Sequence, residues 1–239
     1  MIGFLTLTCH MTVENIQDSF YIRHGKRTFD AAAATLGLAV LAPFLLVTAI
    51  AVKLDDPGPA LFSQIRVGQF GRKFRMFKFR SMRVGGGEGS KLTPAGDPRI
   101  TRLGKWLRKT KIDELPQLLN VVLGNMSIVG PRPEVPEFVC HYNETQRGVL
   151  KARPGITGPS ANVYEEELLA SQEDKERFYI HSVMPRKLEI DLHYVQKISF
   201  CGDVRTLYHT IEKLLVRLYE LSTRSPHSFH ANYRNSSEP

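Results

Sequence analysis

A long uncharged stretch from Ala31 to Val52 limits what this chain can fold into more than any other feature. It reads AAAATLGLAVLAPFLLVTAIAV, and about 20 mostly apolar residues are enough for a helix to cross a bilayer. Pro43 lies near its centre, where a proline removes a backbone hydrogen bond and kinks or breaks a helix. The stretch therefore predicts a membrane-associated helix that is interrupted at Pro43.

Basic residues flank this stretch on both sides, and their placement bears on its topology. The flanking cations are Arg23, Lys26 and Arg27 before it and Lys53 after it. Cytoplasmic flanks carry an excess of Lys and Arg, so both ends are expected on the cytoplasmic side. A helix-break-helix hairpin over residues 26–56 meets this requirement. We predict this re-entrant hairpin and keep an ordinary single span, with the N-terminal residues across the membrane, as the alternative.

The charge of the chain implies an anionic partner. The formal net charge is +8, which favours nucleic acid, anionic lipid or a phosphorylated substrate. Between residues 63 and 111 there are 14 Lys and Arg against two acidic residues, so the excess is concentrated there. Cys9, Cys140 and Cys201 have no metal-binding spacing, and so sparse a set is typical of a reducing compartment.

The remaining sequence predicts an α+β fold that is predominantly helical, with a small β element. A polar segment (1–25) precedes the hairpin, a folded domain (57–221) follows it, and a polar tail (222–239) is expected to be disordered. Residues 61–82 interleave aromatic and basic side chains and predict two short strands with a turn near Gly68 and Gly71. Helices are expected over 100–110, from near Asp113 to Gly124, and over 137–150, 165–179 and 203–221.

Two of these helices are amphipathic, and each has two interpretations. The helix over 100–110 combines leucines and Trp106 with many cations, a composition typical of helices that lie in a membrane interface. Packing on the protein core explains the same pattern equally well. The apolar stripe over 203–221 also indicates either core packing or packing on the membrane surface.

Adjacent carboxylates at Asp113 and Glu114 end the most basic stretch and are the candidate catalytic pair. A structural explanation exists, because Asp caps helices and Glu in a first turn interacts favourably with the helix dipole. The chemical alternative is that one carboxylate attacks phosphorus. Both carboxylates are then candidate ligands of Mg²⁺, which binds through one or two carboxylates plus substrate phosphates.

Candidate phosphate-binding cations accompany this pair. They are Lys78, Arg80, Arg108 and Arg132. Arg132 lies between two prolines, which limit its backbone freedom and favour bidentate phosphate recognition. An ordinary surface arginine is the alternative for Arg132, and solvent-exposed strand residues are the alternative for Lys78 and Arg80.

Several motifs stand in register along the chain and resemble those of a known family. They are Lys26-Arg27-x-x-Asp30, Gly58-Pro59-x-x-Phe62-x-Gln64-x-Arg66-x-Gly68, Lys78-Phe-Arg-Ser-Met82, Asp113-Glu-Leu-Pro-Gln-Leu118, Met126-Ser-x-Val-Gly-Pro-Arg-Pro133, Arg153-Pro-Gly-Ile-Thr-Gly158, Asp191-x-x-Tyr194 and Ser199-x-x-x-Asp203. Over about residues 25–220 the chain resembles the bacterial sugar transferases. These are monotopic phosphoglycosyl transferases that act on polyprenol phosphate, and the size matches their minimal catalytic form.

The resemblance implies a reaction and a location. A sugar-1-phosphate would pass from a UDP-sugar to polyprenol phosphate, with Asp113 as the nucleophile, Glu114 supporting Mg²⁺ binding or proton handling, and Arg132 as a phosphate ligand. It implies the cytoplasmic face of the bacterial inner membrane, contact with membrane lipids and no nucleic-acid partner, and leaves a homo-oligomer open. One departure concerns residues 159–162, Pro-Ser-Ala-Asn, where many relatives have an aromatic-Ala-Gln-Val type of segment.

A second class of function fits the charge alone. A membrane-anchored basic module that binds nucleic acid or anionic lipid needs the cations but not the carboxylate pair. Its binding would weaken steeply with salt and would not change on Asp113→Asn.

Overall fold

The computed structural model describes residues 21–85, 92–94, 96–162, 168–169 and 172–223. It is rich in helix and contains two small two-stranded sheets, which confirms the predicted fold class at that level. The N-terminal segment 1–20 and most of the expected tail, from residue 224, lie outside the described residues.

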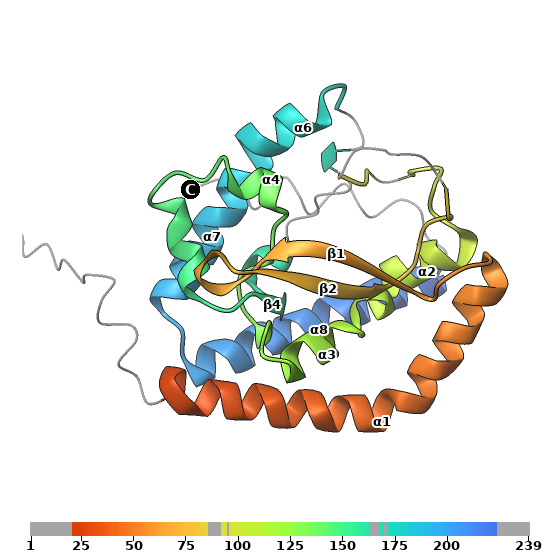
Figure 1. Cartoon of the computed structure of the whole chain (residues 1–239), viewed down its shortest axis with the longest axis horizontal. Helices are drawn as coiled ribbons and strands as arrows, with labels where there is room; N and C mark the ends of the chain where they lie inside the picture. The colour runs from red at the N-terminus through yellow and green to blue at the C-terminus, as the bar shows by residue number, and fades with distance from the viewer. Residues whose placement is uncertain (1–20, 86–91, 95, 163–167, 170–171, 224–239) are drawn as a thin grey trace, which may run out of the picture.

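The apolar stretch forms one long helix, α1 (Lys26–Asp55). The expected interruption of the helix needs correction, because helical structure continues through Pro43. Figure 1 shows instead a bend in the second half of α1, the usual consequence of a proline inside a helix. Among the described residues α1 is the one helix long and apolar enough to cross a membrane, and 11% of its most apolar window is buried.

Polar side chains fasten the start of α1 to the folded domain. Arg27 donates hydrogen bonds to the main-chain carbonyls of Val121 and Val122. Asp30 accepts a hydrogen bond from Ser127 Oγ at 2.6 Å. Lys26 forms an ion pair with Asp203. The basic flank and Asp30 therefore bind the domain, which fixes the direction in which α1 leaves it.

The predicted strand pair is confirmed. Strands β1 (Leu61–Val67) and β2 (Lys73–Phe79) pair antiparallel, with Phe62 opposite Lys78. The turn between them includes Gly71 at φ +76°, a conformation that glycine adopts without strain. The free side of β2 is held by Asn120, whose Oδ1 accepts from Phe77 N at 3.0 Å and whose Nδ2 donates to Arg75 O at 2.7 Å.

The carboxylate pair lies between two helices. Helix α2 (Arg102–Thr110) is capped by Thr101, whose side chain accepts from Gly104 N at 2.9 Å. A short 3₁₀ helix (Ile112–Glu114) follows, and α3 (Gln117–Val122) begins after Pro116. The helix expected from near Asp113 therefore starts later, at Gln117, and Pro116 occupies its N-cap position.

A second, parallel pair of strands brings two glycine-containing loops together. Strand β3 (Ser127–Val129) pairs with β4 (Gly155–Thr157).

The helices that follow are α4 (Pro136–Val139), α6 (Lys175–Phe178), α7 (Met184–Gln196) and α8 (Phe200–Thr223). The single helix expected over 137–150 is wrong, because α4 ends at Val139 and a separate 3₁₀ helix spans Gln146–Lys151. The helix expected over 165–179 falls partly outside the described residues.

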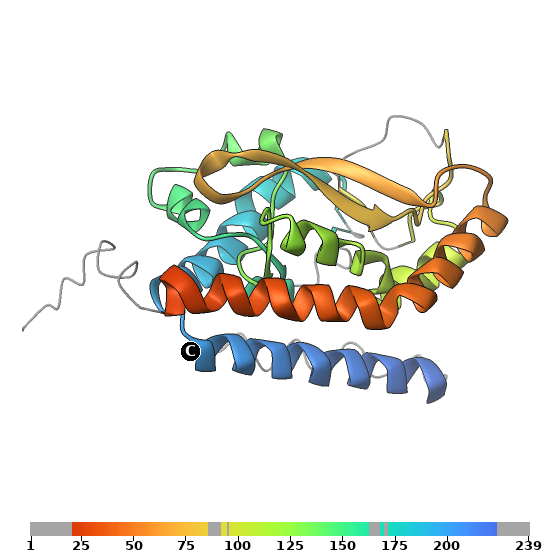
Figure 2. The same ribbon diagram turned by 60° about the horizontal axis from the view of Figure 1, so that its bottom comes forward.

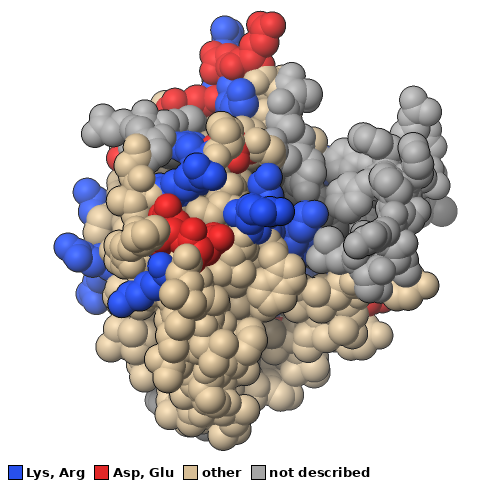
Figure 3. All heavy atoms as spheres, turned by 90° about the vertical axis from the view of Figure 1, so that its right-hand side faces the viewer, with Lys and Arg blue, Asp and Glu red and all other residues tan. Residues whose placement is uncertain are grey.

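Leu207 of α8 packs against the buried residues Val129, Tyr194 and Val195, but most of the apolar stripe of α8 lies outside the core. Its exposed large side chains are Val204, Tyr208, Ile211, Leu215, Val216, Leu218 and Tyr219. Figure 2 shows α8 running alongside α1 on one side of the molecule, and the rings of Phe29 and Phe200 meet edge to face between the two helices. In Figure 3 the charged side chains gather in the upper half of the visible face, above a lower half of mostly uncharged residues. The two helices thus share an apolar side of the molecule.

Candidate active site

Glu114 joins three segments that are far apart in the sequence. Its Oε1 accepts hydrogen bonds from Lys78 Nζ at 2.9 Å and from an Arg132 terminal nitrogen at 3.0 Å. Lys78 comes from β2, and Arg132 comes from the loop after β3. Glu114 and its neighbour Asp113 are both buried. The structure therefore brings four of the predicted site residues together around the carboxylate pair.

The two carboxylates have opposite electrostatic environments. Burial raises the pKa of Asp113, and the charge of Glu114 raises it further, against the opposing effect of Lys78, Lys111 and Arg108. Burial also acts to raise the pKa of Glu114, but Arg132, Lys78 and Lys111 outweigh it and hold that pKa well below the usual value. Glu114 therefore carries the fixed negative charge of the pair.

Asp113 has an oxygen available for chemistry. Its Oδ1 is buried and accepts no hydrogen bond from the residues that the structure describes. A buried carboxylate oxygen without a partner is costly, and such groups concentrate where a ligand or reacting group completes the site. This oxygen is therefore a candidate position for a ligand or a reacting group to complete the site.

The residues fit a magnesium ion that also binds a substrate. Within the described part of the chain no three His, Cys, Asp or Glu side chains are grouped to hold a metal. Mg²⁺ nevertheless binds with one or two carboxylates plus substrate phosphates and water. The unpartnered Oδ1 of Asp113 suits such an ion, whereas Oε1 of Glu114 is already held by two cations.

The remaining predicted cations separate into two groups. Arg108 is on the last turn of α2, and its positive charge opposes the rise that burial causes in the pKa of Asp113, so it acts on the carboxylate pair. Arg80 is buried and donates instead to the side chain and main-chain carbonyl of Asp56, just after α1. Because the guanidinium of Arg80 is engaged at the end of α1, we leave it out of the proposed phosphate site.

Sequence reasoning missed Lys111. It acts on both carboxylates and has φ +58°, a backbone conformation uncommon outside glycine. Its position two residues before Asp113 was the only available signal.

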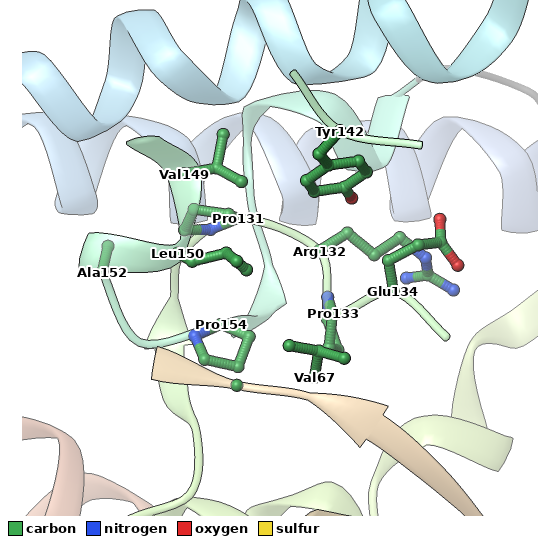
Figure 4. A pocket seen from close by; sticks show the side chains of 11 residues that line it. Val67, Pro131, Arg132, Pro133, Glu134, Tyr142, Val149, Leu150, Ala152 and Pro154 are labelled. Atoms are coloured by element: carbon green, nitrogen blue, oxygen red, sulfur yellow. The ribbon is translucent and has the colours of Figure 1, made fainter. Parts of the chain in front are cut away.

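Two hollows lie beside Arg132. The first has Pro131, Pro133, Pro154 and Tyr142 in its wall (Figure 4). The second is lined by Arg66, Met76, Gln117, Arg132 and Pro133. Arg132 thus lies between the carboxylate pair and two small openings in the surface.

These features define a class of protein. Its domain has a buried pair of carboxylates surrounded by Lys and Arg side chains, and a long apolar helix is attached to that domain. The chain belongs to the bacterial sugar transferase family, whose model matches residues 21–217. This confirms the family that the motifs indicated.

Curated relatives give this similarity more detail. The chain is 38% identical over 196 residues to a UDP-N-acetylgalactosamine-undecaprenyl-phosphate N-acetylgalactosaminephosphotransferase of Aeromonas hydrophila, covering 80% of this chain and 43% of that protein. It is 37% identical over 195 residues to the UDP-glucose:undecaprenyl-phosphate glucose-1-phosphate transferase of Escherichia coli K12, covering 79% and 39%. It is 40% identical over 204 residues to the exopolysaccharide production protein PSS of Rhizobium leguminosarum, covering 80% and 96%. The chain thus spans less than half the length of the first two.

Proposed function

We propose that this protein transfers a sugar-1-phosphate from a UDP-sugar to a polyprenol phosphate and releases UMP. The observation that carries the proposal is the buried pair: Asp113 offers a free oxygen, while Glu114 is held ionised by Lys78 and Arg132. The names of the relatives support the substrate classes, since they act on UDP-sugars and undecaprenyl phosphate.

The proposed chemistry has two displacements at one phosphorus. Asp113 attacks the phosphorus that carries the sugar, the bond from this phosphorus to the UMP oxygen breaks, and UMP leaves with that electron pair. An oxygen of the polyprenol phosphate then attacks the same phosphorus and releases the Asp113 carboxylate. Lys78, Arg108 and Arg132 neutralise charge on the transferred group.

Mg²⁺, held by Asp113 and Glu114 together with the diphosphate, would supply further charge neutralisation. Glu114 keeps Lys78 and Arg132 aimed at the site through its two hydrogen bonds. Burial of the pair excludes water, which favours transfer to the lipid phosphate over hydrolysis.

The alternative of a basic binding module is less consistent with the site. Lys78 and Arg132 point inward to a buried carboxylate rather than outward to a polyanion. Such a module also gives no reason for the unpartnered oxygen of Asp113.

A panel assay tests the proposed activity. We expect UMP release when the full chain in detergent or membranes receives the correct UDP-sugar, Mg²⁺ and undecaprenyl phosphate, and little release without the lipid phosphate beyond a single turnover. UDP-glucose, UDP-N-acetylglucosamine and UDP-N-acetylgalactosamine form the first panel. Binding of DNA or anionic vesicles without UMP release from any sugar in a wider panel would instead support the binding module.

We further propose that α1 enters the inner membrane from the cytoplasmic face and returns to it, with α2 and α8 in the interface. The exposed apolar residues of α1 and α8 support this placement, as does Trp106, which is 49% exposed on α2. Lipid is the favourable environment for such surfaces.

Thiol labelling tests this topology with native cysteines. Single-cysteine variants that keep either Cys9 or Cys140 are exposed to a membrane-impermeant reagent. Cys140 is exposed in the folded domain and serves as the cytoplasmic control. We expect neither thiol to react in intact spheroplasts and both to react after lysis; reaction of Cys9 alone in intact spheroplasts would establish a single span.

A further inference from the structure

Arg132 lies in a loop, and contacts with β4, with α7 and with the segment after β4 fix the position of that loop. The loop runs from Gly130 to Pro133 after β3. Gly130 N donates to Thr157 O at 2.9 Å, and Gly155 N donates to Pro131 O at 2.9 Å. Both bonds attach the loop to β4. They hold the loop up to Pro131, but they do not reach the peptide nitrogen of Arg132.

A buried carboxylate from α7 holds that nitrogen. Asp191 Oδ2 accepts a hydrogen bond from Arg132 N at 3.3 Å. The same oxygen accepts from Ser160 Oγ at 2.8 Å, and Oδ1 accepts from Ser160 N at 3.4 Å. Asp191 and Ser160 are 3% and 1% exposed. Asp191 therefore connects the Arg132 loop, α7 and the segment after β4 in a dry environment, where such bonds have fixed geometry.

Ser160 belongs to the segment Pro159–Asn162, where the sequence differs from the motif that the family resemblance implies. In the structure this segment forms a 3₁₀ helix. This 3₁₀ helix is thus linked through Asp191 to the peptide nitrogen of Arg132.

We propose that Ser160 and Asp191 are positioning residues that set the placement of Arg132 at the carboxylate pair. Neither touches the reacting atoms in this role; both act through the peptide nitrogen of Arg132. The inference rests on the proposed function, because Arg132 is useful there as a phosphate ligand.

A double-mutant cycle tests the inference. Ser160→Ala and Asp191→Asn are each made with Arg132 intact and with Arg132→Ala, and UMP release is measured as kcat and KM for the UDP-sugar. Arg132→Ala is expected to lose roughly 10- to 100-fold, the usual worth of a charged hydrogen bond. With Arg132 present, each positioning variant should lower kcat/KM by about tenfold, since small misplacements are costly. With Arg132→Ala, the same changes should cost less than about twofold.

A matched control comes from Ser127, a second buried serine that donates to a carboxylate, Asp30, at 2.6 Å. Ser127→Ala should change activity by the same factor in both Arg132 backgrounds, whatever that factor is. Equal losses for Ser160→Ala in both backgrounds, or no loss in either, would overturn the positioning role. An inactive parent protein would instead count against the proposed function, so the two failures are distinguishable.

Amide hydrogen exchange provides a readout independent of activity. The segment 130–134 has two prolines and so contributes only three backbone amides to a peptide that covers it, one of which is that of Arg132. Asp191→Asn and Ser160→Ala should speed exchange in this peptide, whereas Ser127→Ala should not. Unchanged exchange in both positioning variants would contradict the inference even where activity falls.

Discussion

Asp113→Asn is expected to lower UMP release by at least about 10³-fold, the scale on which loss of a nucleophile acts. Asparagine has nearly the same shape as aspartate but cannot attack phosphorus through a carboxylate oxygen. Because Asp113 is buried with one unpartnered oxygen, the substitution removes the nucleophile and leaves the packing almost unchanged. The fold should therefore survive while the chemistry stops.

Intact-mass measurement makes this prediction specific. Incubation of the native protein with its UDP-sugar and Mg²⁺, without lipid phosphate, should add the mass of one phosphosugar to the protein, and digestion should place it on the peptide that contains Asp113. Asp113→Asn should show no adduct. The matched control is Glu114→Gln, an equally isosteric change at the neighbouring residue. This variant should form the adduct slowly, because Lys78 and Arg132 lose their charged partner. An adduct of native yield on Asp113→Asn would move the nucleophile to another residue.

Local patterns in the sequence predicted those elements whose side-chain periodicity is strong. The strand pair β1–β2 and helix α8 were found because alternation and helical spacing are encoded within each segment. Membership of Asp113, Glu114, Lys78 and Arg132 in one site was also predicted, from a family resemblance together with the clustering of charge. In the structure Glu114 adjoins Asp113 and accepts hydrogen bonds from Lys78 and Arg132, while the catalytic and phosphate-binding roles of these residues stay predictions.

Other features depended on contacts that the sequence does not show. Arg80 has the same charge as Lys78 and lies two residues after it, so both had the same predicted role. In the structure Arg80 binds Asp56 at the end of α1 instead, a partner 24 residues away in the sequence. Pro43 bends α1 without breaking it, because a single missing hydrogen bond does not decide whether a helix ends. Ser160 and Asp191 were not assigned a role, since nothing in either segment indicates that the other lies beside it.

The backbone at Gly155 lies very close to the backbone at Gly130. A substitution at Gly155 is therefore expected to have the second large effect, a loss of stability. A Cβ at this position would lie 2.1 Å from Gly130 N and 2.3 Å from Thr157 O. Both neighbours are main-chain atoms that take part in the pairing of β3 with β4, so no side-chain rotation relieves the overlap. Gly155→Ala must therefore push the Arg132 loop away from β4.

We expect Gly155→Ala to reduce the free energy of unfolding by about 3 kcal/mol or more, the upper range for overpacking. For a chain of this size that corresponds to a fall in Tm of roughly 6–12 °C, measured by thermal unfolding in detergent. The matched control is Gly148→Ala, whose Cβ would meet only the flexible Leu192 Cδ2 at 3.0 Å and should shift Tm far less. UMP release should also fall in Gly155→Ala below its Tm, because the displaced loop carries Arg132. A Tm and activity equal to those of Gly148→Ala would mean that the two loops are not in backbone contact, and that Arg132 is held by other means.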